Sequence, residues 1–118
     1  MVSKPISRNK LNDFTLVVNP GTVLDNNNAY EMVEIITVAQ DKGYKYIILD
    51  MADLEFISSA GVGAILGTIE NSREAGGDII LCNAAESIIH VLEVLDLAEY
   101  LTVKNNLEDA ASHCGVNS

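Results

Sequence analysis

Two adjacent serines stand at the junction of two contrasting sequence patterns. Ser58 and Ser59 follow the apolar stretch 46–51 and open a stretch of helical periodicity that contains Gly61 and Gly63. Serine hydroxyls at such a place can cap a helix, attack a substrate, hold an anion or accept a phosphate. The residues around them favour some of these chemistries over others.

Capping and phosphorylation are both compatible with the start of a helix. An N-cap serine accepts a hydrogen bond from a free N–H group of the first turn, so Ser59→Ala would cost about 0.5–2 kcal/mol if Ser59 is the cap. The same N–H groups and the helix dipole also favour an anion, and a phosphoserine would therefore be tolerated there. The two roles do not exclude each other.

Nucleophilic catalysis has less support. A nucleophile elbow needs glycines two residues before and two residues after its serine, and Ile57 occupies the first of these positions for Ser59. A triad needs a histidine within reach. His90 falls in an apolar helical stretch, where we expect a partly buried side chain, and His113 lies near the C-terminus. Asp50 ends an apolar stretch as a phosphoaspartate would, but no early acidic pair is present to hold magnesium.

No metal, cofactor or nucleic acid is expected. Cys82 and Cys114 lack metal-ligand spacing, and the chain has no glycine-rich nucleotide motif, so we expect two free thiols in a reducing cytoplasm. A formal net charge of −10 disfavours both nucleic acid and an anionic membrane surface as partners. The chain also contains neither an apolar membrane span nor a signal-peptide core.

The elements that must position the serines alternate between strands and helices. In chain order we predict a strand at 5–8, a turn at 9–13, a strand at 13–19, a helix at 28–42, a strand at 44–51, a helix at 60–74, a strand at 78–83, a helix at 86–97, a strand at 99–103 and a helix at 106–113. This alternation predicts an α/β fold with a mixed, mostly parallel sheet of four or five strands and helices packed on it. The length predicts a single domain over 1–118, with its core at about 13–112.

Two local features of the predicted helices bear on their packing. Asn28 and Glu31 have the spacing of a capping box, and Gly43 is placed to end the same helix. In the helix at 60–74, small residues form a stripe that would let another backbone approach closely. This stripe comprises Ala60, Gly63, Ala64 and Gly67.

The stretch 46–83 closely resembles the STAS domain of bacterial anti-sigma factor antagonists. The resemblance extends over about residues 13–112, and residues 21–25 resemble the weaker first-loop motif of that family, with one extra residue after the glycine. Its most specific part is an apolar strand followed by Asp53, Leu54, Phe56, Ser59, Gly61 and Gly63.

The resemblance implies a regulatory protein without catalytic activity of its own. In such proteins a serine kinase, which is itself the anti-sigma factor, phosphorylates one serine at the start of the helix. The unphosphorylated form captures that kinase and frees the sigma factor, and a PP2C-type phosphatase resets the cycle. By position the acceptor is Ser59, and Ser58 is the alternative, standing where many members have aspartate. The implied partner-binding residues are Asp25, Ser58, Ser59, Ala60, Gly61, Val62 and Gly63.

Two other functions stay open. The first is a STAS interaction module in a stress-signalling complex or on the cytoplasmic side of a transporter, and the absence of any further segment disfavours the transporter. The second is an enzyme of an α/β hydrolase-like class that uses Ser59, which the missing base and orienting acid disfavour.

Overall fold

The computed structural model describes residues 4–116, and both ends of the predicted domain, 1–3 and 117–118, lie outside them. Its strands are β1 (Ser7–Asn12), β2 (Thr15–Asn19), β3 (Val23–Leu24), β4 (Tyr46–Asp50), β5 (Phe56–Ile57), β6 (Asp78–Cys82) and β7 (Thr102–Lys104). Its helices are α1 (Ala29–Asp41), α2 (Ser59–Glu74), α3 (Glu86–Val94) and α4 (Leu107–His113). The predicted alternation of strands and helices is confirmed.

The main sheet has five strands in the order β1-β2-β4-β6-β7. The last four run parallel, and β1 pairs antiparallel with β2 at one edge. The mixed, mostly parallel sheet is therefore as predicted. The central strand β4 is buried on both faces, because Ile47 and Leu49 pack into one apolar cluster and Ile48 into the other.

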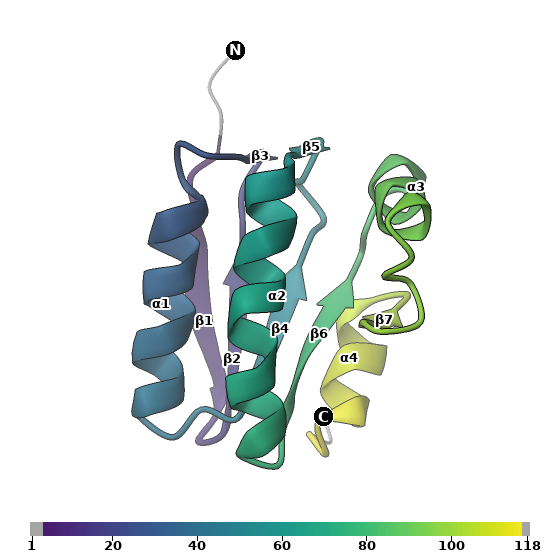
Figure 1. Cartoon of the computed structure of the whole chain (residues 1–118). Coiled ribbons are helices and arrows are strands. Elements are labelled where there is room, and N and C mark those ends of the chain that lie inside the picture. Colours follow the sequence, from purple (N-terminus) through teal and green to yellow (C-terminus); the bar gives the residue numbers. More distant parts are fainter. Residues whose placement is uncertain (1–3, 117–118) are drawn as a thin grey trace.

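The helices cover the two faces of the sheet unequally. Helices α1, α2 and α3 contribute to the larger apolar cluster on one face, and α4 packs on the other face with a smaller cluster around Ile48 and Ile80. Figure 1 shows α1 and α2 side by side in front of the sheet, with the starts of both helices at the same end of the molecule. None of the helices within residues 4–116 is long and apolar enough to cross a membrane.

The N-terminal edge of the sheet differs from the prediction. Residues 9–12, predicted as part of a turn, belong to β1, and the turn falls at 13–14. The misassignment has a physical reason: β1 is an edge strand whose first four residues are exposed, so it lacks the alternation of a half-buried strand.

The region after β6 also differs. Helix α3 ends at Val94 instead of residue 97, because Asp96 adopts a positive φ of 58° and the Leu97 N–H donates to the Leu92 carbonyl at 2.8 Å. The last strand begins at Thr102 instead of residue 99. His90 is exposed, contrary to the prediction, since it lies on the face of α3 opposite Ile88 and Leu92.

Candidate functional site

A short parallel ladder joins two loops that are far apart in the sequence. Strand β3 pairs with β5, with Val23 opposite Phe56 and Leu24 opposite Ile57. The ladder continues into the serine pair, because the Ser58 N–H donates to the Leu24 carbonyl at 2.9 Å. Residues 21–25 therefore lie directly beside the start of α2. Strands of two residues have no periodicity, so neither of them is predicted from the sequence.

The two serines have different roles in the structure. Ser58 is the N-cap of α2: its Oγ accepts a hydrogen bond from the Gly61 N–H at 3.4 Å, and its carbonyl accepts one from Val62 at 3.0 Å. Ser58 is half-buried, whereas Ser59 is the first helical residue and is exposed. The capping role thus belongs to Ser58, and the hydroxyl of Ser59 is the accessible one.

Two glycines near the serines differ in what surrounds them. A Cβ on Gly61 would come within 2.7 Å of the Leu24 carbonyl oxygen and 2.8 Å of Ile57 Cγ1, so the contact between α2 and the β3–β5 ladder requires a glycine. A Cβ on Gly63 would meet nothing within 4 Å. The same is true of Gly67, so no backbone within residues 4–116 approaches these two positions, and the predicted close approach of another backbone there stays a prediction. They leave small side chains on the exposed face of α2.

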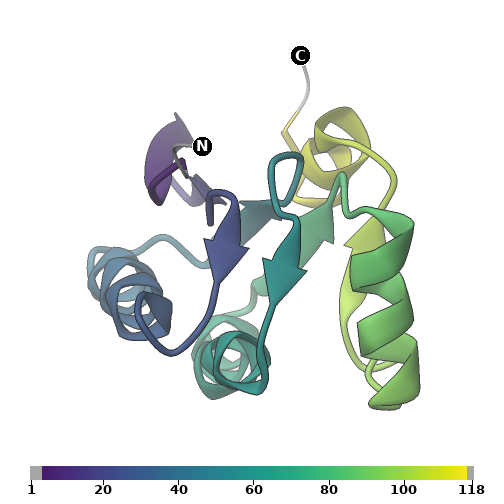
Figure 2. The same cartoon turned by 90° about the horizontal axis from the view of Figure 1, so that it is seen from above.

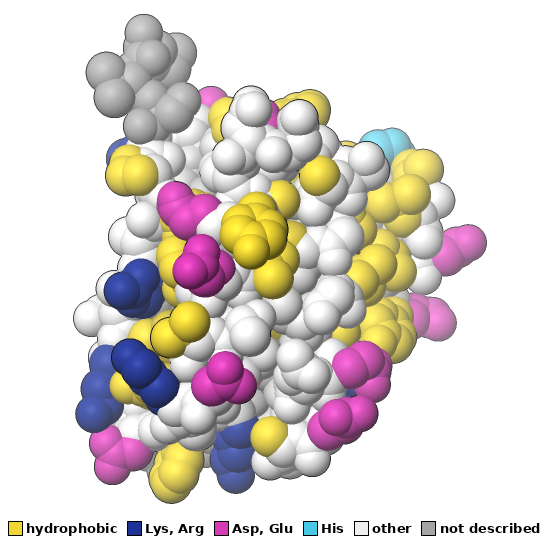
Figure 3. Space-filling view, turned by 60° about the vertical axis from the view of Figure 1, so that its left-hand side comes forward, with side chains coloured by type: hydrophobic (Ala, Val, Ile, Leu, Met, Phe, Trp, Pro, Cys, Tyr) yellow, Lys and Arg dark blue, Asp and Glu magenta, His cyan; other side chains and the backbone are white. Residues whose placement is uncertain are grey.

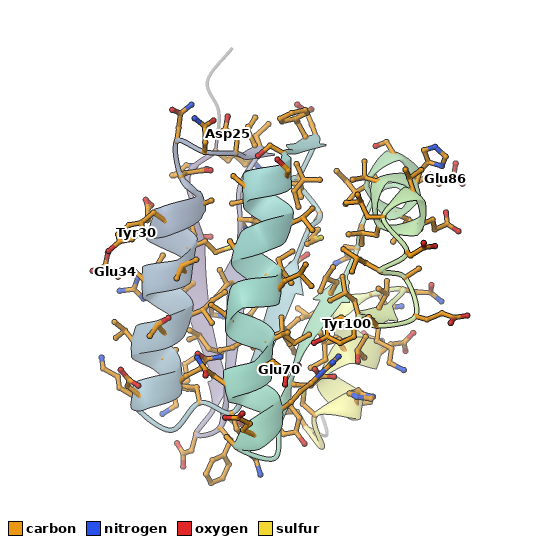
Figure 4. All side chains as sticks on the ribbon, viewed as in Figure 1. Asp25, Tyr30, Glu34, Glu70, Glu86 and Tyr100 are labelled. Atoms are coloured by element: carbon orange, nitrogen blue, oxygen red, sulfur yellow. The ribbon has the colours of Figure 1, made fainter. Side chains whose placement is uncertain are left out.

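Asp25 lies in a tight loop between β3 and α1. Its Oδ1 accepts a hydrogen bond from the Asn27 N–H at 2.9 Å, and its own N–H donates to Asn28 Oδ1 at 2.9 Å. Asn28 also donates from Nδ2 to the Val23 carbonyl at 2.7 Å. The predicted capping box is wrong, because the Asn28 side chain reaches back into this loop instead of capping α1. Figure 4 shows the half-buried Asp25 at the end of the molecule where α2 begins.

Asp53 ties the loop that precedes the serines to the N-terminal segment. Its carboxylate accepts hydrogen bonds from Lys4 Nζ at 3.2 Å and Asn19 Nδ2 at 3.0 Å. These bonds, with the Lys4 bond as the larger cause, lower the pKa of Asp53 below its usual value. Asn19 in turn accepts from the Gly21 N–H at 2.8 Å. One hydrogen-bonded chain therefore links the loop after β2 to the loop before Ser58, and no pattern in the sequence indicates that Lys4 belongs to it.

The first turn of α2 itself presents only small, uncharged residues to solvent, and the exposed Phe56 belongs to the strand just before it. Ser59 and Gly63 are exposed, while Gly61 and Val62 are buried beneath them. The Phe56 side chain is 53% exposed although it is large and apolar. A partner that packs here would thus bury apolar surface without displacing a structural hydrogen bond of Ser59.

The other residues considered for catalysis do not join this site. Asp50 accepts hydrogen bonds from the Ala52 N–H at 3.2 Å and from Asn83 Nδ2 at 3.0 Å, which gives it a structural role between two strand ends. The neighbouring Cys82 is fully buried, and burial raises the pKa of its thiol to about 12. Within residues 4–116, no three His, Cys, Asp or Glu side chains gather as a metal site would require.

Known proteins share both the sequence pattern and the fold. The STAS domain family model matches residues 6–110. BtrV of Bordetella bronchiseptica, provisionally named an anti-sigma factor antagonist, is 29% identical over 90 residues, which span 76% of this chain and 78% of that protein. The anti-sigma F factor antagonist of Paenibacillus polymyxa is 25% identical over 79 residues, spanning 67% of this chain and 68% of that protein. The structure of the anti-sigma factor antagonist SpoIIAA in its unphosphorylated form superposes with a TM-score of 0.83 at 21% identity, covering 97% of this chain and 100% of that one.

Proposed function

Because this chain belongs to the STAS domain family, we propose that it is an anti-sigma factor antagonist that works by partner switching. Its unphosphorylated form binds an anti-sigma factor that is also a serine kinase, and so releases the sigma factor. Phosphorylation of Ser59 ends that binding. The domain, which we take to span 1–118, acts in the bacterial cytoplasm and catalyses no reaction itself.

The observation that carries the proposal is the exposure of Ser59 at the first position of α2. A kinase must bring its phosphate donor to a hydroxyl that is accessible and not already engaged. The Ser58 hydroxyl is half-buried and accepts the capping bond from Gly61, so its modification would disturb the start of the helix. This difference supports Ser59 over Ser58 as the acceptor.

The same position makes phosphorylation effective as a switch. A phosphate adds about 1.5 to 2 negative charges and three acceptor oxygens. In the free protein, the N–H groups of the first turn of α2 that Ser58 does not bind would stabilise it. In the complex, the phosphate would be buried against a surface that fits Ser59, Gly63 and the exposed Phe56 ring. A buried charge without a partner is costly, so the complex weakens while the fold is unchanged.

Asp25 strengthens this effect. Its carboxylate belongs to the loop that the β3–β5 ladder holds beside the serines. Two negative groups at one contact surface repel each other and are harder to desolvate together. We therefore assign Asp25 to the partner-binding surface, with Ser58, Ser59, Ala60 and Gly63, while the buried Gly61 and Val62 support that surface from beneath.

The experiment pairs phosphosite mapping with variants at the two serines. The candidate kinase and ATP are incubated with the wild type, Ser59→Ala and Ser58→Ala, and the modified residue is identified by mass spectrometry. We expect phosphate on Ser59 in the wild type and in Ser58→Ala, and none in Ser59→Ala. Phosphate on Ser58 would move the acceptor by one residue. If no serine kinase that binds this chain modifies either serine, the proposal is wrong.

Two further variants test the binding step. Ser59→Ala keeps a small surface and should bind the kinase constitutively, even in the presence of ATP. Ser59→Asp should bind more weakly than the wild type, but less weakly than the phosphorylated protein, since one carboxylate carries less charge and fewer acceptor oxygens than a phosphate. Recovery of the kinase after affinity purification on each variant measures both effects. Equal recovery on Ser59→Ala and Ser59→Asp would contradict the charge mechanism.

A further inference from the structure

A groove of about 360 Å³ lies between the edge strand β1 and the outer side of α1, on a part of the surface that does not include Ser59. It forms because β1 extends the sheet beyond the strands that α1 covers (Figure 2). Arg8 on β1 lies opposite Val18, a residue of the larger apolar cluster, so the two side chains share the face of the sheet on which α1 packs. The volume falls at the lower end of the range for small-molecule pockets.

The floor of the groove is apolar. Leu16 of β2 and Ile35, Val38 and Ala39 of α1 line it, and Val38 is 46% exposed. An occupant with an apolar body would remove this surface from water, at a gain of about 25 cal/mol per Å² of apolar area.

The walls carry two cations and two anions. Glu31 and Glu34 lie toward the start of α1, Lys42 follows its last residue, and Arg8 stands on the opposite wall. Figure 3 shows acidic and basic side chains around apolar ones on this face of the molecule. None of the four forms an ion pair within 4.0 Å among residues 4–116, whereas Lys10 pairs with Asp13 at 3.0 Å.

The helix dipole accounts for only part of this arrangement. An acid in the first turn and a base at the end of a helix are each favourable, which explains Glu31 and Lys42. Glu34 lies beyond the first turn, and Arg8 belongs to a strand. The helical rise separates Glu34 from Lys42 by about 12 Å along the axis, so a negative end and a positive end face one apolar floor.

We propose that this groove binds a short apolar peptide as a zwitterion. The peptide ammonium group pairs with Glu31 and Glu34, its carboxylate pairs with Lys42, and its apolar side chains cover Val38 and Ile35. Arg8 donates to a carbonyl oxygen of the peptide from the opposite wall. A simple fatty carboxylate would leave the two glutamates without a partner, and an apolar amine would leave Lys42 and Arg8 without one.

Binding is measured by titrating the isotope-labelled full chain with L-leucyl-L-leucine and following backbone amide shifts. We expect saturable shifts around residues 31–42 with a dissociation constant on the order of 0.1–1 mM. N-acetyl-leucyl-leucine lacks the ammonium charge and leucyl-leucine amide lacks the carboxylate. Each should bind at least about tenfold more weakly, since a hydrogen bond to a charged group is lost.

Variants assign each end of the peptide to its wall. Glu34→Gln should weaken binding of leucyl-leucine about tenfold and leave binding of the N-acetyl form unchanged, because that form has no ammonium group. Lys42→Gln should also weaken binding of leucyl-leucine about tenfold, and it should leave binding of the amide unchanged, because the amide has no carboxylate. Lys104→Gln and Glu108→Gln are matched controls outside the groove and should bind as the wild type does. The same result is expected for Ser59→Ala, so this test is independent of the partner switch. The absence of saturable shifts up to about 10 mM, shifts confined to another surface, or equal binding of all three probes would overturn the proposal.

Discussion

The contact between α2 and the β3–β5 ladder makes a quantitative prediction for Gly61→Ala. The new methyl group would lie 2.7 Å from the Leu24 carbonyl oxygen and 2.8 Å from Ile57 Cγ1, so one of these atoms must shift. The Leu24 carbonyl already accepts the Ser58 N–H at 2.9 Å, and moving it weakens the ladder that positions the serines. Overpacking of this kind costs about 1–3 kcal/mol, and a weakened hydrogen bond adds about 0.5–1.5 kcal/mol.

Part of this cost is offset by helix propensity. Alanine is favoured over glycine inside a helix by about 1 kcal/mol, so we expect a net loss of about 0.5–3.5 kcal/mol in the free energy of unfolding. Gly63→Ala is the matched control in the same turn, because its methyl group would meet nothing within 4 Å. That variant should gain up to about 1 kcal/mol.

Urea titration of the two variants measures both signs in one experiment. In a thermal melt, a loss of 1 kcal/mol should in addition lower Tm by about 4 °C in a domain of this size. Opposite signs for neighbouring glycines would establish that the close contact, and not helix propensity, selects Gly61. If Gly61→Ala is as stable as Gly63→Ala, the described packing of α2 against the ladder is wrong.

Three further predictions concern the cap, one ion pair and one thiol. In urea titration, Ser58→Ala should lower the free energy of unfolding by about 0.5–2 kcal/mol, because Ser58 supplies the N-cap of α2. Ser59→Ala should stay within about 0.5 kcal/mol of the wild type. Equal losses in the two variants would contradict the assignment of the cap to Ser58. The hydrogen bonds from Lys4 and Asn19 lower the pKa of Asp53, so they stabilise the fold above the usual pKa of 3.8, and this stabilisation is lost as the pH falls through the lower pKa of the folded state. The difference in unfolding free energy between the wild type and Asp53→Asn should therefore shrink below about pH 4. A difference that stays constant with pH would refute this coupling. Cys82, whose pKa is raised to about 12 by burial, should react with a thiol reagent at pH 8 only when the protein unfolds, and rapid labelling in native buffer would exclude its burial.

The sequence predicted the parts of the fold that periodicity determines. The apolar run at 46–50 forms a central strand because Ile47, Ile48 and Leu49 are all buried, which requires cover on both faces. Helix α2 was predicted to within one residue of its start. Gly43 ends the turn after α1 with a φ of 101°, a conformation that glycine adopts without strain.

The parts that were missed depend on contacts between distant segments. The residues of β3 and β5 carry no strand pattern of their own. Each of these two-residue strands is extended because it pairs with the other. Asn28 has the spacing of a capping residue, but its side chain hydrogen-bonds to the Val23 carbonyl and the Asp25 N–H and not to the first turn of α1. His90 lies within an apolar pattern, yet α3 packs through Ile88 and Leu92, which leaves His90 on the outer face of the helix. Such outcomes are decided by tertiary partners that local patterns do not encode.

The candidate site was predicted more fully than the loops around it. The sequence placed Ser58, Ser59 and Gly61 at a strand-to-helix junction, and the structure has them there. It did not indicate which serine caps the helix, since both spacings are acceptable. The difference depends on the Ser58 N–H bond to Leu24, which fixes Ser58 in extended backbone and leaves Ser59 as the first helical residue.

The most direct test of the central claim is calorimetric titration of the anti-sigma kinase, without nucleotide hydrolysis, into the unphosphorylated protein and into the same protein phosphorylated only on Ser59. The account predicts a loss of affinity of at least about 100-fold, because burial of an unpartnered charge costs several kcal/mol. Equal affinity of the two forms would contradict it, and so would tighter binding of the phosphorylated form.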